Sequence, residues 1–183
     1  MIKRLRALRL REEAGYNLVE MLTVMMIMSV VFAGITTVFV AGSNAQAEQD
    51  RRFQAQVTTR LALDKIRRDI HCASDVTPFA TTAVTLKVPS GCGGDVSWCT
   101  AAVSGYTNRY RLYRQSGTTC SAATGVMVAD YLTSGDVFPG FAHTTGCLCL
   151  ASLQVDFNVS VKGTSVGSYD LTDTIFLRNS TRI

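Results

Sequence analysis

Charged residues and proline are missing from a long stretch near the N-terminus. No charged residue lies between Met21 and Ala47, and no proline precedes Pro78 in this chain of 183 residues. A helix can therefore run through the whole region without meeting a residue that would break it. An apolar run of this length without charge predicts a helix that spans a membrane.

Groups that commonly carry catalysis are also scarce. The chain has two histidines, His71 and His143, and it contains no Gly-x-Ser-x-Gly, phosphate-loop or dinucleotide-binding pattern. We therefore predict that the protein is not an enzyme and has no cofactor. Tandem repeats, heptad arrays and low-complexity tails are absent too, and the length suits one globular domain plus an anchor.

The apolar segment from Leu18 to Val40 contains a single ionisable residue, Glu20. About 20 helical residues with a rise of 1.5 Å each cross a bilayer core of roughly 30 Å, so the segment is long enough to do so. A carboxylate in lipid costs about 2.5–3.5 kcal/mol on insertion scales and is usually functional. Glu20 is therefore a candidate functional residue.

A basic leader precedes this segment. Of the formal net charge of +4, +3 lies in residues 1–15, which carry Lys3, Arg4, Arg6, Arg9 and Arg11 against Glu12 and Glu13. The positive charge predicts that the N-terminus is cytoplasmic, and it gives little reason to expect nucleic acid. A secretory signal would have a shorter apolar stretch and a small-residue cleavage site after it.

The run Gly15-Tyr16-Asn17-Leu18-Val19-Glu20, between a basic leader and an apolar helix, resembles the prepilin signal of type IV pilins and type II secretion pseudopilins. The resemblance implies that a prepilin peptidase cleaves between Gly15 and Tyr16 and that Tyr16 is then N-methylated. It also implies that Glu20 pairs with the new amine of a neighbouring subunit and sets the axial register of a filament. An uncleaved single-pass anchor with an external domain is the plain alternative.

Helix-forming residues continue beyond the apolar segment. We predict one helix from about Tyr16 to Cys72, transmembrane over residues 16–42 and amphipathic over residues 43–74, with Asp64 and Arg68 able to pair along it. The amphipathic part has two apolar stripes, Phe53, Val57 and Leu61 on one side, and Leu63, Ile66 and Ile70 on another. A helix that is apolar on two sides needs two packing partners, and we expect its own head domain and neighbouring helices. Complete burial in its own domain is the alternative.

Beyond Ser74 the apolar residues alternate with a period of two, which indicates strands. The predicted strands are residues 82–88, 106–114, 126–132, 153–161 and 174–178, separated by turns rich in Gly, Ser and Thr. The expected fold class is α+β. Its long N-terminal helix packs on a mostly antiparallel sheet formed by residues 75–183, in a pilin-like arrangement.

The head extends the resemblance. Residues 63–70 resemble the end of the helix in PilW- and PulJ-type minor pilins, and residues 110–114, 128–132 and 174–179 follow the strand order of such proteins. This implies a minor pilin or pseudopilin. Its partners would be other pilins, the prepilin peptidase, an inner-membrane assembly platform and, before assembly, membrane lipid. It implies a single-pass cytoplasmic membrane protein with its head outside, which later joins an extracellular or periplasmic filament. Pilus, competence apparatus and secretion system remain open.

All cysteines lie beyond the apolar segment. They are Cys72, Cys92, Cys99, Cys120, Cys147 and Cys149. An even number on the translocated side favours disulfides. The pairing stays open, although Cys92 and Cys99 bracket a plausible closed loop, and Cys147 and Cys149 are too close to bond each other comfortably. Zinc binding by His143, Cys147 and Cys149 with His71 and Cys72 has no recognised spacing, so we predict no metal site.

Arginine and tyrosine alternate between Tyr106 and Arg114. Arg109, Arg111 and Arg114 could contact phosphates while the tyrosines stack on bases, and a DNA- or surface-binding adhesin or competence protein on the same scaffold is therefore an alternative function. Strand alternation places Arg109 and Arg111 on one face and Arg114 on the other, so only part of the cluster can face one ligand. A solvated strand face is the simpler interpretation.

Overall fold

The computed structural model describes residues 17–143, 149–162 and 168–180. One long helix, α1 (Leu18–Cys72), is followed by strands and one short 3₁₀ helix. The chain divides into two compact units, Met1–Ala47 and Glu48–Ile183.

The first unit contains the apolar part of α1. Every large apolar side chain from Leu18 to Val40 is exposed, with exposed fractions between 47% and 75%. By length and composition α1 is able to cross a membrane. The unit therefore presents apolar side chains on all sides of its helix, as expected for a segment that is covered by lipid or by other helices.

The second unit contains the end of α1 and an antiparallel sheet. Its elements are β1 (Asp75–Ala80), β2 (Ala83–Lys87), η1 (Ser90–Cys92), β3 (Val96–Ala102), β4 (Tyr110–Ser116), β5 (Val126–Leu132), β6 (Gly140–Ala142), β7 (Ser152–Val159) and β8 (Tyr169–Phe176). The strand order is β1-β2-β3-β4-β5-β7-β6, and β8 pairs with β7. This confirms the predicted α+β layout.

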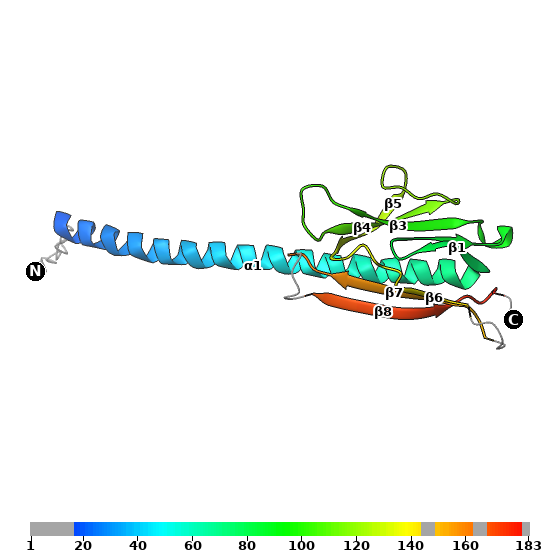
Figure 1. Cartoon of the computed structure of the whole chain (residues 1–183). Coiled ribbons are helices and arrows are strands. Elements are labelled where there is room, and N and C mark those ends of the chain that lie inside the picture. The colour runs from blue at the N-terminus through cyan, green and yellow to red at the C-terminus, as the bar shows by residue number, and fades with distance from the viewer. Residues whose placement is uncertain (1–16, 144–148, 163–167, 181–183) are drawn as a thin grey trace, which may run out of the picture. The chain divides into compact units, whose positions relative to one another are not determined.

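The sheet curls around the end of α1, with β3, β4 and β5 on one side and β7 and β8 on the other (Figure 1). The link between β5 and β7 is narrow, because their pairing is confined to Leu132 and Val159. The two ends of the sheet approach each other, since the amide of Phe138 donates to the carbonyl of Thr81 and the rings of Phe79 and Phe141 lie 6.0 Å apart. One face of the helix consequently packs against the sheet and belongs to the core of the head.

The core follows from two periodicities. On α1 the buried residues Ala55, Thr59, Ala62, Leu63, Ile66 and Ile70 recur at helical spacing. On β7 the residues Leu153, Val155, Phe157 and Val159 alternate with more exposed ones, as predicted. Trp98, Phe138 and Phe157 are the largest fully buried side chains of the core.

Several predicted strand boundaries are wrong. Strands β1, β3 and β6 were not predicted, and β8 begins at Tyr169 rather than at Thr174. Strand β1 contains Pro78, which an edge strand tolerates because its free side needs no amide hydrogen. Strand β3 is buried continuously from Val96 to Cys99, so it lacks the alternation by which a half-buried strand is recognised.

Candidate functional site

Glu20 lies in the first turn of α1. The amides of Glu20 and Met21 both donate to the carbonyl of Asn17, at 2.8 and 3.2 Å. Among the described residues no cation lies within ion-pair distance of its carboxylate. The predicted cleavage residues Gly15 and Tyr16 lie outside the described residues.

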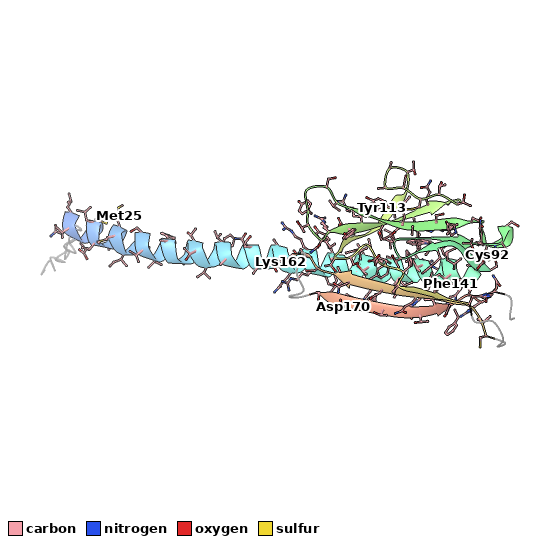
Figure 2. All side chains as sticks on the ribbon, in the orientation of Figure 1. Met25, Cys92, Tyr113, Phe141, Lys162 and Asp170 are labelled. Carbon is pink, nitrogen blue, oxygen red and sulfur yellow. A yellow bond between two sulfur atoms is a disulfide. The ribbon has the colours of Figure 1, made fainter. Side chains whose placement is uncertain are left out.

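The serine and threonine side chains within the apolar segment are hydrogen-bonded to their own helix. Their hydroxyl groups donate to backbone carbonyls three or four residues earlier, at 2.7–2.8 Å, in Thr23, Ser29, Thr36 and Thr37. Hydroxyls that bond to their own helix need no water. The apolar segment, with Met25 as one labelled example in Figure 2, therefore has the properties of a helix that can reside in lipid or in a helix bundle.

The two predicted stripes on the second part of α1 have opposite environments. Leu63, Ile66 and Ile70 are at most 3% exposed and pack against the sheet, so this stripe is the one that faces the head. The other stripe is exposed, with Phe53 at 67%, Val57 at 38% and Leu61 at 61%. The alternative of complete burial in the protein's own domain is therefore wrong, and this second stripe is available to another partner.

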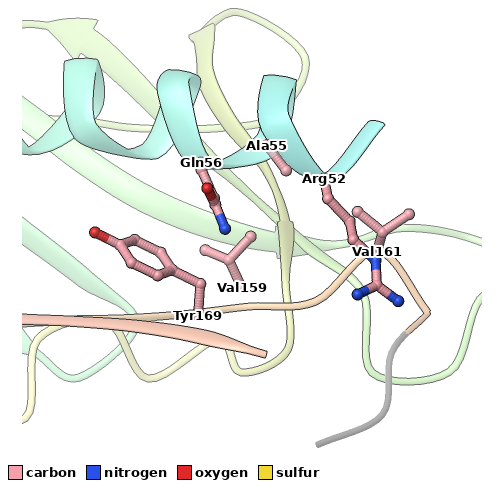
Figure 3. A pocket seen from close by; sticks show the side chains of 6 residues that line it. All are labelled: Arg52, Ala55, Gln56, Val159, Val161 and Tyr169. Carbon is pink, nitrogen blue, oxygen red and sulfur yellow. The ribbon is translucent and has the colours of Figure 1, made fainter. Parts of the chain in front are cut away.

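Two small pockets lie between the second part of α1 and the sheet. The cavity lined by Arg52, Gln56 and Tyr169, with Ala55, Val159 and Val161, has a volume of about 10 Å³ (Figure 3). A volume of roughly 10–15 Å³ holds about one water molecule, so this site is too small for an organic ligand. A groove of about 130 Å³ lies between Thr58 of α1 and residues 127–131 of β5.

The three candidate DNA-contacting arginines are all paired with carboxylates. Asp130 on β5 accepts two hydrogen bonds from Arg109, at 3.0 and 2.7 Å, and one from Arg111 at 3.1 Å. The Arg109 guanidinium also lies 4.0 Å from the ring centre of Tyr131 and 4.9 Å from that of Tyr106. Burial opposes ionisation of Asp130, yet the hydrogen bond from Arg109 and the Tyr131 amide outweigh it and lower the pKa of this carboxyl.

Arg114 points to the opposite side of β4, as the alternation predicts. Its guanidinium donates to both carboxylate oxygens of Asp69 on α1, at 2.8 and 3.1 Å. Asp69 also accepts a hydrogen bond of 3.1 Å from the indole of the fully buried Trp98. Arg114 therefore joins the sheet to α1. Asp64 was predicted to pair with Arg68, but its carboxylate binds Arg67 instead.

The structure resolves part of the cysteine pairing. Cys99 forms a disulfide with Cys120, so the closed loop between Cys92 and Cys99 that the sequence suggested is wrong. Cys149 is disulfide-bonded as well, and Cys147 lies outside the described residues. Cys72 and Cys92 are free thiols. Within the described ranges no three His, Cys, Asp or Glu side chains gather as a possible metal site.

Comparison of the chain with protein-family models, with curated proteins and with solved structures found no match.

Proposed function

We propose that this chain is a structural subunit, a minor pilin or pseudopilin, of a type IV pilus-like filament. The observation that carries the proposal is the apolar segment of α1 from Leu18 to Val40, which is exposed throughout and holds Glu20 as its one ionisable residue. Such a surface requires a cover. Lipid covers it before assembly, and the like helices of other subunits cover it in the filament.

Processing prepares the subunit for assembly. A prepilin peptidase removes residues 1–15, and Tyr16 becomes an N-methylated terminus that carries a positive charge. The basic leader holds this end in the cytoplasm while the head lies outside. An inner-membrane assembly platform then moves the subunit from lipid into the filament.

Glu20 sets the position of each subunit along the filament. Its carboxylate pairs with the amine at Tyr16 of a neighbouring copy. Two isolated charges in an apolar medium are costly, and their pairing relieves both costs. Helices that slide out of register separate the two charges, so the pair selects one stagger.

The exposed stripe of Phe53, Val57 and Leu61 extends the contact beyond the membrane segment. These side chains lie on the part of α1 that belongs to the head, and their face is turned away from the core. In the assembled state they pack against a neighbouring helix. The first test is the intact mass of the membrane-extracted protein, which should lack residues 1–15 and carry one added methyl group. A full-length mass would instead support the uncleaved anchor.

The second test removes the charge of Glu20 alone. Glu20→Gln should leave membrane insertion intact and reduce incorporation into filaments sheared from cells that carry the assembly machinery. Thr23→Val is the matched control, because it alters a polar side chain one turn away without removing a charge. Normal incorporation of Glu20→Gln would overturn the proposed role of this carboxylate.

DNA binding is not proposed as a second function. Asp130 compensates Arg109 and Arg111, and Asp69 compensates Arg114. A phosphate would have to displace a carboxylate from each of them. Salt-dependent binding of DNA to the protein would reopen the question.

A further inference from the structure

The two free thiols of the described chain lie at the same end of the head. Cys72 is the last residue of α1 and is half-buried, and Cys92 is the last residue of η1 and is exposed. Cys92 is labelled in Figure 2 beside the end of the helix. The residues are separated in sequence by the hairpin of β1 and β2, so their approach is a product of the fold.

The backbone holds the two positions together. The amide and hydroxyl of Ser74 both donate to the carbonyl of Lys87, at 2.8 and 3.0 Å. The amide of Cys92 then donates to the carbonyl of Pro89 at 2.8 Å and turns the chain back. The two side chains lie close enough to interact, since Cys92 is the main cause of the raised pKa of the Cys72 thiol.

The other cysteines indicate the redox environment. Cys99 and Cys120 form a disulfide, and Cys149 is also disulfide-bonded. Disulfides form and persist in oxidising compartments. Two neighbouring thiols in the same domain would meet the same oxidants. A bound metal is a poorer explanation of the pair, since no third ligand joins it among the residues that the structure describes.

We propose that Cys72 and Cys92 form a disulfide that closes the β1–β2 hairpin into a covalent ring and ties the last residue of α1 to the head. The helix end is already held by weaker contacts, because Asn179 donates to the carbonyl of Cys72 at 2.9 Å. The disulfide makes that attachment covalent. This inference does not depend on the proposed filament, and either can fail without the other.

The bond forms by exchange with an external disulfide. The thiolate of Cys92 attacks one sulfur, the external S–S bond breaks, a mixed disulfide forms, and the displaced thiolate takes a proton. Cys72 loses its proton and attacks the sulfur of Cys92, and the second external thiol leaves. Two electrons thus pass from the two cysteines to the external disulfide.

Accessibility sets the order of these steps. Cys92 is exposed and Cys72 is half-buried, so the external disulfide reaches Cys92 first. The neighbouring Cys92 side chain, followed by burial and the charge of Asp69, raises the pKa of the Cys72 thiol. A raised pKa lowers the thiolate fraction available for attack. In reduced protein, iodoacetamide should therefore label Cys92 faster than Cys72.

Peptide mapping of the full chain in detergent tests the bond directly. The protein, prepared from an oxidising compartment, is denatured and treated with iodoacetamide, then reduced and treated with N-ethylmaleimide. Trypsin alone leaves Cys92 and Cys99 on one peptide, so a protease that cuts before Asp95 is added. We expect a linked pair of peptides, residues 69–74 with residues 88–94, in the unreduced digest. The disulfide of Cys99 and Cys120 is the internal control.

Two results would overturn the proposal. One is that iodoacetamide labels both Cys72 and Cys92 in the oxidised protein before reduction. The other is that either cysteine is found in a disulfide with a different cysteine. Serine variants give a second readout. Cys72→Ser and Cys92→Ser should lower the urea midpoint equally, and the double variant should lower it no further, because either change removes the same bond. Additive effects would show that no shared bond exists.

Discussion

Two parts of the same helix differ in the exposure of their apolar side chains. Between Leu18 and Val40 all of the large ones are exposed, whereas Leu63, Ile66 and Ile70 are buried beneath the sheet. Both parts are regular helix. The comparison shows that a regular helix does not by itself bury its apolar side chains, because the sheet covers those of one part while those of the other are exposed.

The largest expected difference between the two parts comes from the same substitution made in each. Ile66→Ala removes a side chain that is 1% exposed and should cost about 2–5 kcal/mol of head stability. Ile35→Ala changes one that is 59% exposed and should leave the head unaffected. Urea unfolding in detergent, followed by the fluorescence of Trp98, the single tryptophan, measures both. Equal losses of stability in the two variants would contradict the distinction between the buried and the exposed part of α1.

A smaller loss is expected where α1 meets β3 and β4 through Asp69. Asp69→Asn keeps an acceptor for Trp98 but removes the charge that binds Arg114, and hydrogen bonds to charged groups contribute about 1.5–3 kcal/mol each. Asp64→Asn is the control, since Asp64 is 59% exposed and such exposed pairs contribute about 0–1 kcal/mol. The same unfolding assay measures both variants. An equal loss of stability in Asp69→Asn and Asp64→Asn would show that Asp69 does not stabilise the contact between α1 and the sheet.

The Asp130 cluster should make the head sensitive to acid. Because the pKa of Asp130 is lowered in the folded state, its pair with Arg109 stabilises the head fully above the ordinary value of 3.8. As the pH falls below that value, the unfolded chain takes up a proton first and the stabilisation is lost. Between pH 5 and pH 2 the urea midpoint of Asp130→Asn should therefore fall less than that of the unmodified protein. Asp50→Asn, at an exposed position, is the control and should follow the unmodified protein. Parallel pH profiles for Asp130→Asn and the unmodified protein would contradict this account.

The smallest effect on stability is expected at the exposed stripe. Leu61→Gln should change the stability of the head by no more than about 0.5 kcal/mol, since the side chain is 61% exposed. Its incorporation into filaments should nevertheless fall, because a polar group replaces an apolar contact with the neighbouring helix. Arg51→Gln, at another exposed position of α1, is the matched control. Destabilisation of the monomer by Leu61→Gln would show that the stripe serves the head itself.

Local patterns predicted those parts of the fold in which one face is buried and the other is not. The alternation along β7 and the stripe that includes Ile66 were both confirmed. Strand β3 was not predicted, because Val96, Ser97, Trp98 and Cys99 are all buried and the strand shows no alternation. Strand β1 was not predicted either, because it contains Pro78 and proline is rarely found in a strand except at the edge of a sheet. Whether a strand lies at an edge depends on how the other strands pair.

The candidate sites were also predicted only in part from the sequence. Arg109, Arg111 and Arg114 were recognised as a cluster, but the acids that bind them, Asp130 and Asp69, lie on other elements and gave no local signal. The prepilin-like interpretation of Gly15, Tyr16 and Glu20 remains a prediction.

The sequence alone determined a long apolar helix with one acidic residue, a second amphipathic part of that helix, and a sheet-forming remainder, since these depend on the spacing of neighbouring residues. Tertiary structure alone decided which stripe of α1 is buried, which carboxylate meets each arginine, and which cysteines lie together. Those choices depend on contacts between residues far apart in the chain, and local periodicity carries no information about such distances.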